Sequence, residues 1–284
     1  MSSDIGRDLG RDMDQIAPET TMLRTSEQMP ERTIRVTVVG CSGSYPGPDS
    51  PASCYLVQAR DGLRTWSIVL DMGNGALGAL QRYVDPLRVD AVLISHLHAD
   101  HCVDMTSYYV LRKYHPTGTQ PKIPVWGPKG TAKRLANAYD LPRKPGMREE
   151  FSFRVYKLPI TVGPFTITPY EVDHPVPAYG LRLEAFDKVV AYSGDTGPIP
   201  VLDELAADAD LFLCEASFRS CDDNPPHLHL TGAEAGEIAT RASVKRLIVT
   251  HVPPWHDAQV MLGEATKAYD GPTELAAQGV VYDL

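Results

Sequence analysis

Cysteine is scarce in this chain and follows no metal-binding or redox pattern. The cysteines are odd in number and scattered: Cys41, Cys54, Cys102, Cys214 and Cys221. No Cys-x-x-Cys pair occurs, which excludes the redox and zinc-ribbon motifs built on that spacing. A chain of 284 residues with 43% hydrophobic content can bury a substantial core without disulfides. We therefore expect reduced thiols in a cytoplasmic protein.

Basic residues are also few. The chain has 27 Lys and Arg against 36 Asp and Glu, which gives a formal net charge of -9. Such a charge repels a polyanion at long range unless basic residues cluster locally. Nucleic acid is therefore disfavoured as a partner, although not excluded.

The N-terminal segment 1–32 lacks an apolar stretch that could serve as a signal peptide or a membrane span. It also lacks hydrophobic periodicity and β-branched runs. We predict a flexible extension without a function of its own over residues 1–32, and no membrane partner. No Ser-rich or charge-block linker divides the rest, so we predict one domain over residues 33–284.

Short apolar runs rich in β-branched residues recur from Thr33 onward and predict strands. These runs are Ile34–Val39, Ser67–Leu70, Ala91–Ile94, Lys122–Trp126, Phe165–Glu171, Val189–Tyr192, Leu211–Cys214 and Leu247–Thr250. Helical spacing appears in Ala76–Tyr83, Val103–Tyr114, Thr131–Tyr139, Ile199–Ala206, Thr231–Ala242 and Asp257–Tyr269. Because strands and helices are interspersed, we predict an α/β fold with helices covering the sheets. The order from Phe165 onward partly repeats the first half, which would fit a four-layer sandwich.

Four potential metal ligands directly follow the predicted strand Ala91–Ile94: His96, His98, Asp100 and His101. In extended chain the first two side chains project to the same side, and a turn at the intervening alanine can bring the other two to a second point nearby. Imidazole and carboxylate without thiolate suit Zn²⁺ first, with Mn²⁺ or Fe²⁺ also acceptable. A lone histidine is usually a surface residue, but this group predicts ligands for two neighbouring metal ions.

Three further side chains can complete the site. His174, Asp195 and His251 each follow a predicted strand at a turn. In this pattern, His96, His98 and His174 would hold one ion, Asp100, His101 and His251 would hold the other, and Asp195 would bridge them. Taken singly, His174 or His251 would more often be structural, but together they form a coherent set.

Several of these segments together resemble the metallo-β-lactamase superfamily. They are the His96–His101 run, Val69–Gly75, Ser193–Thr196 and Thr250–His251. The resemblance implies an αββα four-layer sandwich with a binuclear metal site at the open edge between the sheets. It also implies that Asp71 orients metal ligands without contacting the metals.

Three more segments resemble the phosphodiesterase branch that includes tRNase Z: His174–Arg182, Leu213–Phe218 and His229–Ala235. In that branch a departing alkoxide needs a proton or a positive contact, which His229 oriented by Glu215 could provide. The residues assigned to catalysis are therefore Asp100, Glu215 and His229. His227, two residues earlier in a Pro-rich loop, remains a rival, and His229 could instead only begin the helix that follows.

One departure from the tRNase Z pattern narrows the substrate. Those enzymes insert a protruding arm between the ligands that correspond to His174 and Asp195, whereas only twenty residues separate the two here. With the acidic net charge, this favours a small phosphodiester over tRNA.

The overall pattern is most similar to bacterial metallo-β-lactamase-fold cyclic-nucleotide phosphodiesterases of the atypical class II type. The similar stretches are Val39–Ser44, Gly47–Ser53, His96–Cys102, Tyr114–Pro116, Tyr192–Gly197, Leu213–Ser217 and Thr250–Trp255. The resemblance implies hydrolysis of 3′,5′-cyclic nucleotides, cAMP first, to nucleoside 5′-monophosphates by a metal-bound hydroxide. A homodimer is compatible with it. The alternatives are a lactone or thioester hydrolase, a tRNase Z-like ribonuclease and a non-enzymatic interaction protein.

Aromatic residues near the predicted ligands are candidates for stacking on a base. Trp255 lies four residues beyond His251, and Tyr108, Tyr109 and Tyr114 belong to the predicted helix after the metal loop. For most of them, packing in the core is the more common role of such side chains.

Overall fold

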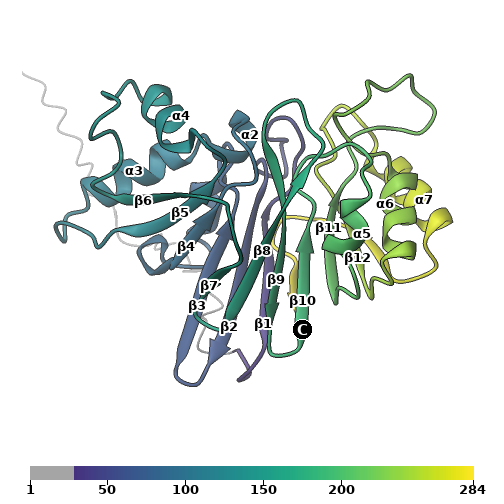
Figure 1. The fold of residues 1–284 in the computed structure, drawn as a ribbon, viewed down its shortest axis with the longest axis horizontal. Coiled ribbons are helices and arrows are strands. Elements are labelled where there is room, and N and C mark those ends of the chain that lie inside the picture. The colour runs from purple at the N-terminus through teal and green to yellow at the C-terminus, as the bar shows by residue number, and fades with distance from the viewer. Residues whose placement is uncertain (1–28) are drawn as a thin grey trace, which may run out of the picture.

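Two β-sheets of seven strands each lie face to face between layers of helices (Figure 1). The computed structural model describes residues 29–284. In sheet order, the first sheet comprises β14 (Val281–Asp283), β1 (Ile34–Gly40), β2 (Cys54–Asp61), β3 (Arg64–Leu70), β4 (Ala91–Leu93), β5 (Ile123–Gly127) and β6 (Phe151–Val155). The second comprises β13 (Thr273–Leu275), β12 (Leu247–Thr250), β11 (Leu211–Glu215), β10 (Lys188–Tyr192), β9 (Ala178–Ala185), β8 (Phe165–Val172) and β7 (Ile160–Val162).

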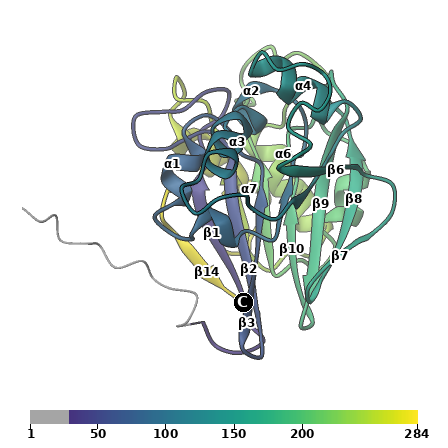
Figure 2. The same cartoon turned by 90° about the vertical axis from the view of Figure 1, so that its left-hand side faces the viewer.

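Helices cover the outer face of each sheet. The first sheet is accompanied by α1 (Ala76–Leu80), α2 (Ala99–Cys102), α3 (Met105–Lys113) and α4 (Thr131–Ala138), and the second by α5 (Val201–Leu205), α6 (Gly232–Arg241) and α7 (Ala258–Ala268). A 3₁₀ turn spans Pro86–Arg88. Figure 2 shows α1 and α3 in front of the strands of the first sheet. The predicted four-layer αββα sandwich is confirmed.

The strands are apolar on both sides because each sheet is buried on both faces. On β1, Val36 and Val38 belong to the core between the sheets, while Val39 packs into the core under the helices of the first sheet. On β11, Leu213 lies between the sheets and Phe212 lies under the helices of the second sheet. Successive side chains of a strand point to opposite faces, so a doubly covered strand becomes a continuous apolar run.

Six strands were not expected from the sequence: β2, β6, β7, β9, β13 and β14. The last two have three residues each, too few for a pattern, and they form by pairing with distant strands. β14 adds to β1 in antiparallel register, with Tyr282 opposite Val36. The predicted helices all exist, but their ends differ. α3 starts at Met105 and α1 ends at Leu80, so both helices are shorter than the predicted ranges Val103–Tyr114 and Ala76–Tyr83.

The predicted extension 1–32 lies outside the described residues except for its last four. Of these, Met29 is 1% exposed, and its carbonyl accepts a hydrogen bond of 2.6 Å from Arg60 Nη1. This end of the segment therefore packs on the domain. From residue 29 onward, no helix combines the length and apolar character that a bilayer span requires. All five cysteines are free.

The parallel strands bring many chain turns to one edge of the sandwich. β3 to β6 are parallel to one another, as are β10 to β13. Their carboxyl ends lie at the edge where α2 sits between the two sheets (Figure 1). Every predicted metal ligand follows the carboxyl end of a strand, so the fold directs all of them to this edge.

Candidate metal centre

Three imidazole nitrogens converge at the mouth of this edge. His98 Nδ1 lies 3.0 Å from His96 Nε2 and 3.2 Å from His174 Nε2. His96 and His98 follow β4, whereas His174 comes from the turn between β8 and β9. Ligands 2.0–2.1 Å from a tetrahedral zinc ion are separated by about 3.3 Å. We call these residues the histidine cluster, and their spacing fits the coordination of one ion.

Four more donors form a second group, the carboxylate cluster, comprising Asp100, His101, Asp195 and His251. His101 Nε2 lies 3.1 Å from His251 Nε2 and 3.4 Å from Asp100 Oδ2. His251 Nε2 lies 3.3 Å from the same Asp100 oxygen. Asp100 and His101 lie on α2, so the predicted turn after His98 is one turn of helix.

Asp195 belongs to the carboxylate cluster and also reaches towards the histidine cluster. Its Oδ1 is 3.2 Å from His101 Nε2 and 3.4 Å from His251 Nε2, while its Oδ2 is 3.6 Å from His96 Nε2. Oδ1 is buried and has no hydrogen-bond partner among the described residues. A buried carboxylate oxygen without a donor is costly. The arrangement therefore fits a carboxylate that bridges two cations.

The protonation states also suit metal binding. Burial lowers the pKa of His96, His98 and His174, which leaves neutral imidazoles. Burial opposes ionisation of Asp195, but His101 and His251 hold its pKa well below the usual range. Against the effect of burial, Asp195 and Asp71 raise the pKa of His101. Positive charge is thus favoured at the point where an ion would lie, and the donor set fits a divalent metal.

Asp71 orients His101 from behind, as expected. Its Oδ2 accepts hydrogen bonds from His101 Nδ1 at 2.8 Å, Ser95 Oγ at 2.7 Å and Tyr192 Oη at 2.7 Å. Its Oδ1 accepts from the Ser95 amide at 2.6 Å. Gly73, just downstream, is needed for close approach, because a Cβ there would lie 1.9 Å from the Asp100 carbonyl oxygen.

Two further candidate ligands, His174 and His251, are held in the same way. His174 Nδ1 donates to the Leu228 carbonyl at 2.9 Å, and His251 Nδ1 lies 2.9 Å from Ser217 Oγ. Fixing the remote nitrogen fixes which nitrogen faces a metal. Sequence reasoning missed Ser95, Ser217 and Tyr192, and only their positions beside ligand segments hinted at a role.

His229 lies beside both clusters, and Glu215 holds it there. His229 Nδ1 donates to Glu215 Oε1 at 2.8 Å, and the ring centroid is 5.6 Å from those of His174 and His251. Burial opposes protonation, yet Glu215 raises the pKa of His229 to about 9. Glu215, His229 and His251 also form a third group of possible metal ligands. However, Glu215 already accepts hydrogen bonds from the Thr196 and Ser217 amides. It is therefore better suited to hold a protonated His229 than to bind a metal ion.

The rival histidine lies outside this arrangement. His227 Nδ1 pairs with Asp173 Oδ2 at 2.6 Å, and its side chain is 74% exposed. No contact to a side chain of either cluster is found for it within residues 29–284. The geometry therefore places His229, and not its rival His227, beside the two clusters.

Comparison with known proteins identifies the family. The model of the beta-lactamase superfamily domain matches residues 67–252, a span that contains every ligand described above. The chain belongs to the beta-lactamase superfamily. The Mycobacterium leprae protein ML1173 is 46% identical, covering 89% of each chain. Ribonuclease Z of Myxococcus xanthus is 27% identical, covering 88% of this chain and 98% of that one.

A solved structure of a member of the superfamily agrees with the fold. The metallo-β-lactamase fold protein YhfI of Bacillus subtilis superposes with a TM-score of 0.79 at 28% identity, over 89% of this chain and 100% of that one. From its family and relatives, the present chain is a metallo-hydrolase. Its histidine and carboxylate clusters could bind divalent metal.

The aromatic candidates differ in exposure. Tyr108 and Tyr109 are buried in the core under the helices, so they cannot stack on a base. Tyr114 and Trp255 are exposed. Trp255 packs against Tyr45, an aromatic residue that was not among the candidates from the sequence.

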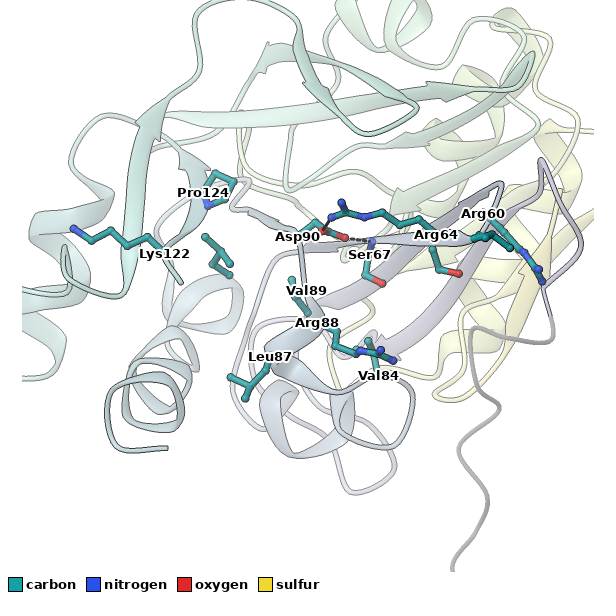
Figure 3. A pocket seen from close by; sticks show the side chains of 13 residues that line it. Arg60, Arg64, Ser67, Val84, Leu87, Arg88, Val89, Asp90, Lys122 and Pro124 are labelled. Atoms are coloured by element: carbon teal, nitrogen blue, oxygen red, sulfur yellow. Dashed lines mark hydrogen bonds and ion pairs between the residues drawn. The ribbon is translucent and has the colours of Figure 1, made fainter. Parts of the chain in front are cut away.

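A cavity of about 660 Å³ (Figure 3) is lined by residues at the amino ends of β3, β4 and β5, whereas the two clusters follow the carboxyl ends of strands. Arg60, Arg64, Arg88 and Lys122 line it, and Asp90 pairs with Arg64 at 2.6 Å. No ligand residue contributes to its walls. It is therefore separate from the reaction site.

Proposed function

We propose that this chain is a binuclear-metal phosphodiesterase that hydrolyses 3′,5′-cyclic nucleotides, cAMP first, to nucleoside 5′-monophosphates. Seven side chains would hold the two ions: His96, His98, Asp100, His101, His174, Asp195 and His251. Two divalent ions, Zn²⁺ first, would supply Lewis acidity towards the phosphate and a nucleophile at neutral pH.

The observation that carries the proposal is the His229–Glu215 pair beside the clusters. His229 Nδ1 is bound to Glu215, so Nε2 remains for the substrate. With its pKa raised to about 9, against the effect of burial, His229 is protonated at neutral pH. A phosphodiester releases an alkoxide, which needs that proton, whereas a thioester releases a thiolate that is stable without one.

The chain's own residues then divide the work. His229 Nε2 gives its proton to the 3′ oxygen as the P–O3′ bond breaks, and water restores the proton afterwards. Glu215 stabilises the imidazolium before transfer and keeps the ring in place. Asp100 stays ionised, since His101 and His251 lower its pKa against the effect of burial, and it orients the attacking water.

A small substrate is supported by what lies between His174 and Asp195. The intervening residues form β9 and β10, a hairpin that belongs to the second sheet. None of them is left to form an arm that could hold tRNA. A ribonuclease of the tRNase Z type is therefore the weaker candidate, although several relatives carry the name ribonuclease Z.

The test is a substrate panel with purified protein loaded with Zn²⁺ or Mn²⁺. The panel contains 3′,5′-cyclic AMP, a tRNA precursor, a γ-lactone and a thioester, and chromatography follows the products. We expect release of 5′-AMP from the cyclic nucleotide and much slower reaction of the others. Asp100→Ala is the inactive control.

The variant His229→Ala separates the candidate classes. A phosphodiesterase should lose turnover with this change, whereas thioester hydrolysis on the same centre should not, because a thiolate leaves without a proton. Turnover of the lactone or the precursor RNA in preference to the cyclic nucleotide would contradict the proposal.

A further inference from the structure

Tyr45 and Trp255 are exposed aromatic side chains that contact each other, on segments that flank Cys41 and the cluster residue His251. Tyr45 is 43% exposed and Trp255 is 59% exposed. Their ring centroids are 5.4 Å apart with an interplanar angle of 35°. Within residues 29–284, no other two exposed aromatic rings make such a contact. Large aromatic surface left in water beside a reaction site usually serves binding.

The two rings are carried by segments that are bonded together at the ligand His251. The His251 amide donates to the Cys41 carbonyl at 3.1 Å, and the Gly43 amide donates to the Val252 carbonyl at 3.1 Å. A Cβ on Gly43 would lie 2.1 Å from the His251 carbonyl oxygen, so only glycine allows this approach. Trp255 is four residues beyond His251, within about 14 Å along an extended chain.

Both segments are stiff. Ser42 Oγ donates to the Tyr45 carbonyl at 2.7 Å, and the His256 amide donates to the Pro253 carbonyl at 3.0 Å. Pro46, Pro253 and Pro254 add fixed backbone angles. Rings held in place before binding lose little entropy when a ligand stacks on them.

We propose that Tyr45 and Trp255 form the subsite on which the base of the nucleotide substrate stacks. The inference rests on the proposed function, because it assigns a binding site to the nucleoside half of that substrate. Two stacked aromatic rings favour a flat, uncharged ring system, and a purine offers more surface than a pyrimidine. Stacking is tolerant of base identity, so adenine and guanine should both bind.

Kinetics with and without a base tests the subsite. The substrates are 3′,5′-cyclic AMP and the abasic 1-deoxyribose 3′,5′-cyclic phosphate. Trp255→Ala should lower kcat/KM for cyclic AMP about 5- to 150-fold, mostly through KM, and leave the abasic diester unchanged. Trp255→Phe should retain most of the activity because the aromatic face remains. Tyr114→Ala, which removes a ring that is 66% exposed, is the matched control and should change neither substrate.

Fluorescence gives a readout that does not need turnover. Trp66 and Trp126 remain in Trp255→Phe, so the difference between the two proteins reports on Trp255 alone. Titration with 5′-AMP should quench the wild type and leave Trp255→Phe nearly unchanged.

Equal loss on both substrates, or the same quenching in both proteins, would overturn the subsite. A base-specific loss in Tyr114→Ala instead would do the same. If the wild type hydrolyses no cyclic nucleotide, the proposed function fails, and quenching by 5′-AMP still decides whether the rings bind a base.

Discussion

The histidine cluster and the carboxylate cluster lie side by side but differ in charge and exposure. The histidine cluster consists of neutral imidazoles, and His98 and His174 are only partly buried. The carboxylate cluster is buried throughout and contains two ionised carboxylates. An ion in the carboxylate cluster would be surrounded by both carboxylates, whereas an ion in the histidine cluster would meet only Asp195 Oδ2 and keep more of its charge. We infer that the first ion binds more tightly and that the second faces the substrate.

Asp195→Ala should have the largest effect, because Asp195 is the carboxylate close to both clusters. Turnover should fall to background, and the bound metal should fall below two ions per chain, as measured by elemental analysis. The matched control is Asp173→Asn, which alters a carboxylate next to His174 that contacts neither cluster. If Asp195→Ala retained two ions, the clusters would bind metal independently, and a shared role of Asp195 would be contradicted.

His229→Ala should impair chemistry and leave both clusters loaded. Loss of a general acid costs roughly 10²- to 10⁴-fold in turnover. Elemental analysis should still find two ions, and His227→Ala, the matched control, should keep near-normal turnover. Loss of metal from His229→Ala would make this residue a ligand instead of a proton donor.

The pH profile tests the same assignment. The raised pKa of His229, about 9, means that the proton is present below pH 9 and is lost as the pH rises through that value. Turnover should therefore fall on the alkaline side near pH 9 in the wild type. The alkaline limb should disappear in His229→Gln.

In the metal-free protein, removing a histidine from one cluster should lower the free energy of unfolding by a different amount from removing one from the other cluster. His101→Ala leaves the buried carboxylates without their cation, and unpaired buried charge costs about 3–5 kcal/mol of unfolding free energy. His98→Ala removes a partly exposed neutral ring and should cost less than about 1 kcal/mol. Urea denaturation after chelation measures both values. Equal losses would mean that the clusters do not differ in charge as described.

Ser217→Ala should leave the fold intact and weaken metal binding at the carboxylate cluster. Ser217 Oγ lies 2.9 Å from His251 Nδ1 and donates to Glu215 Oε2 at 3.0 Å. Loss of such a support weakens metal affinity about 10- to 100-fold. Titration with a competing chelator should show one of the two ions weakened, whereas equal weakening of both would contradict the separation of the clusters.

The side chains of the two clusters could be picked out from the sequence as candidate metal ligands because each follows a strand with a strong apolar signal. Parallel strands bring their carboxyl ends to one edge, so polar residues just after such strands meet there. The same signal predicted eight of the strands but missed the long strands β2 and β9. It failed for β13 and β14, since three residues such as Thr273–Leu275 carry no periodicity and depend on a distant partner.

The supporting side chains were beyond the sequence. Ser95, Ser217 and Tyr192 are common residue types, and their roles arise only when the fold brings them to a ligand's remote nitrogen or to Asp71. The different surroundings of His227 and His229 could not be predicted from the sequence for the same reason. Both have a carboxylate partner, and burial beside the clusters distinguishes them only in three dimensions.

The most direct test of the account is a zinc titration of the metal-free protein, with bound metal and hydrolysis of 3′,5′-cyclic AMP measured on the same samples. The account predicts that the first equivalent binds without turnover, and that release of 5′-AMP rises with the second. Full activity at one equivalent, or two bound ions without release of 5′-AMP, would contradict it.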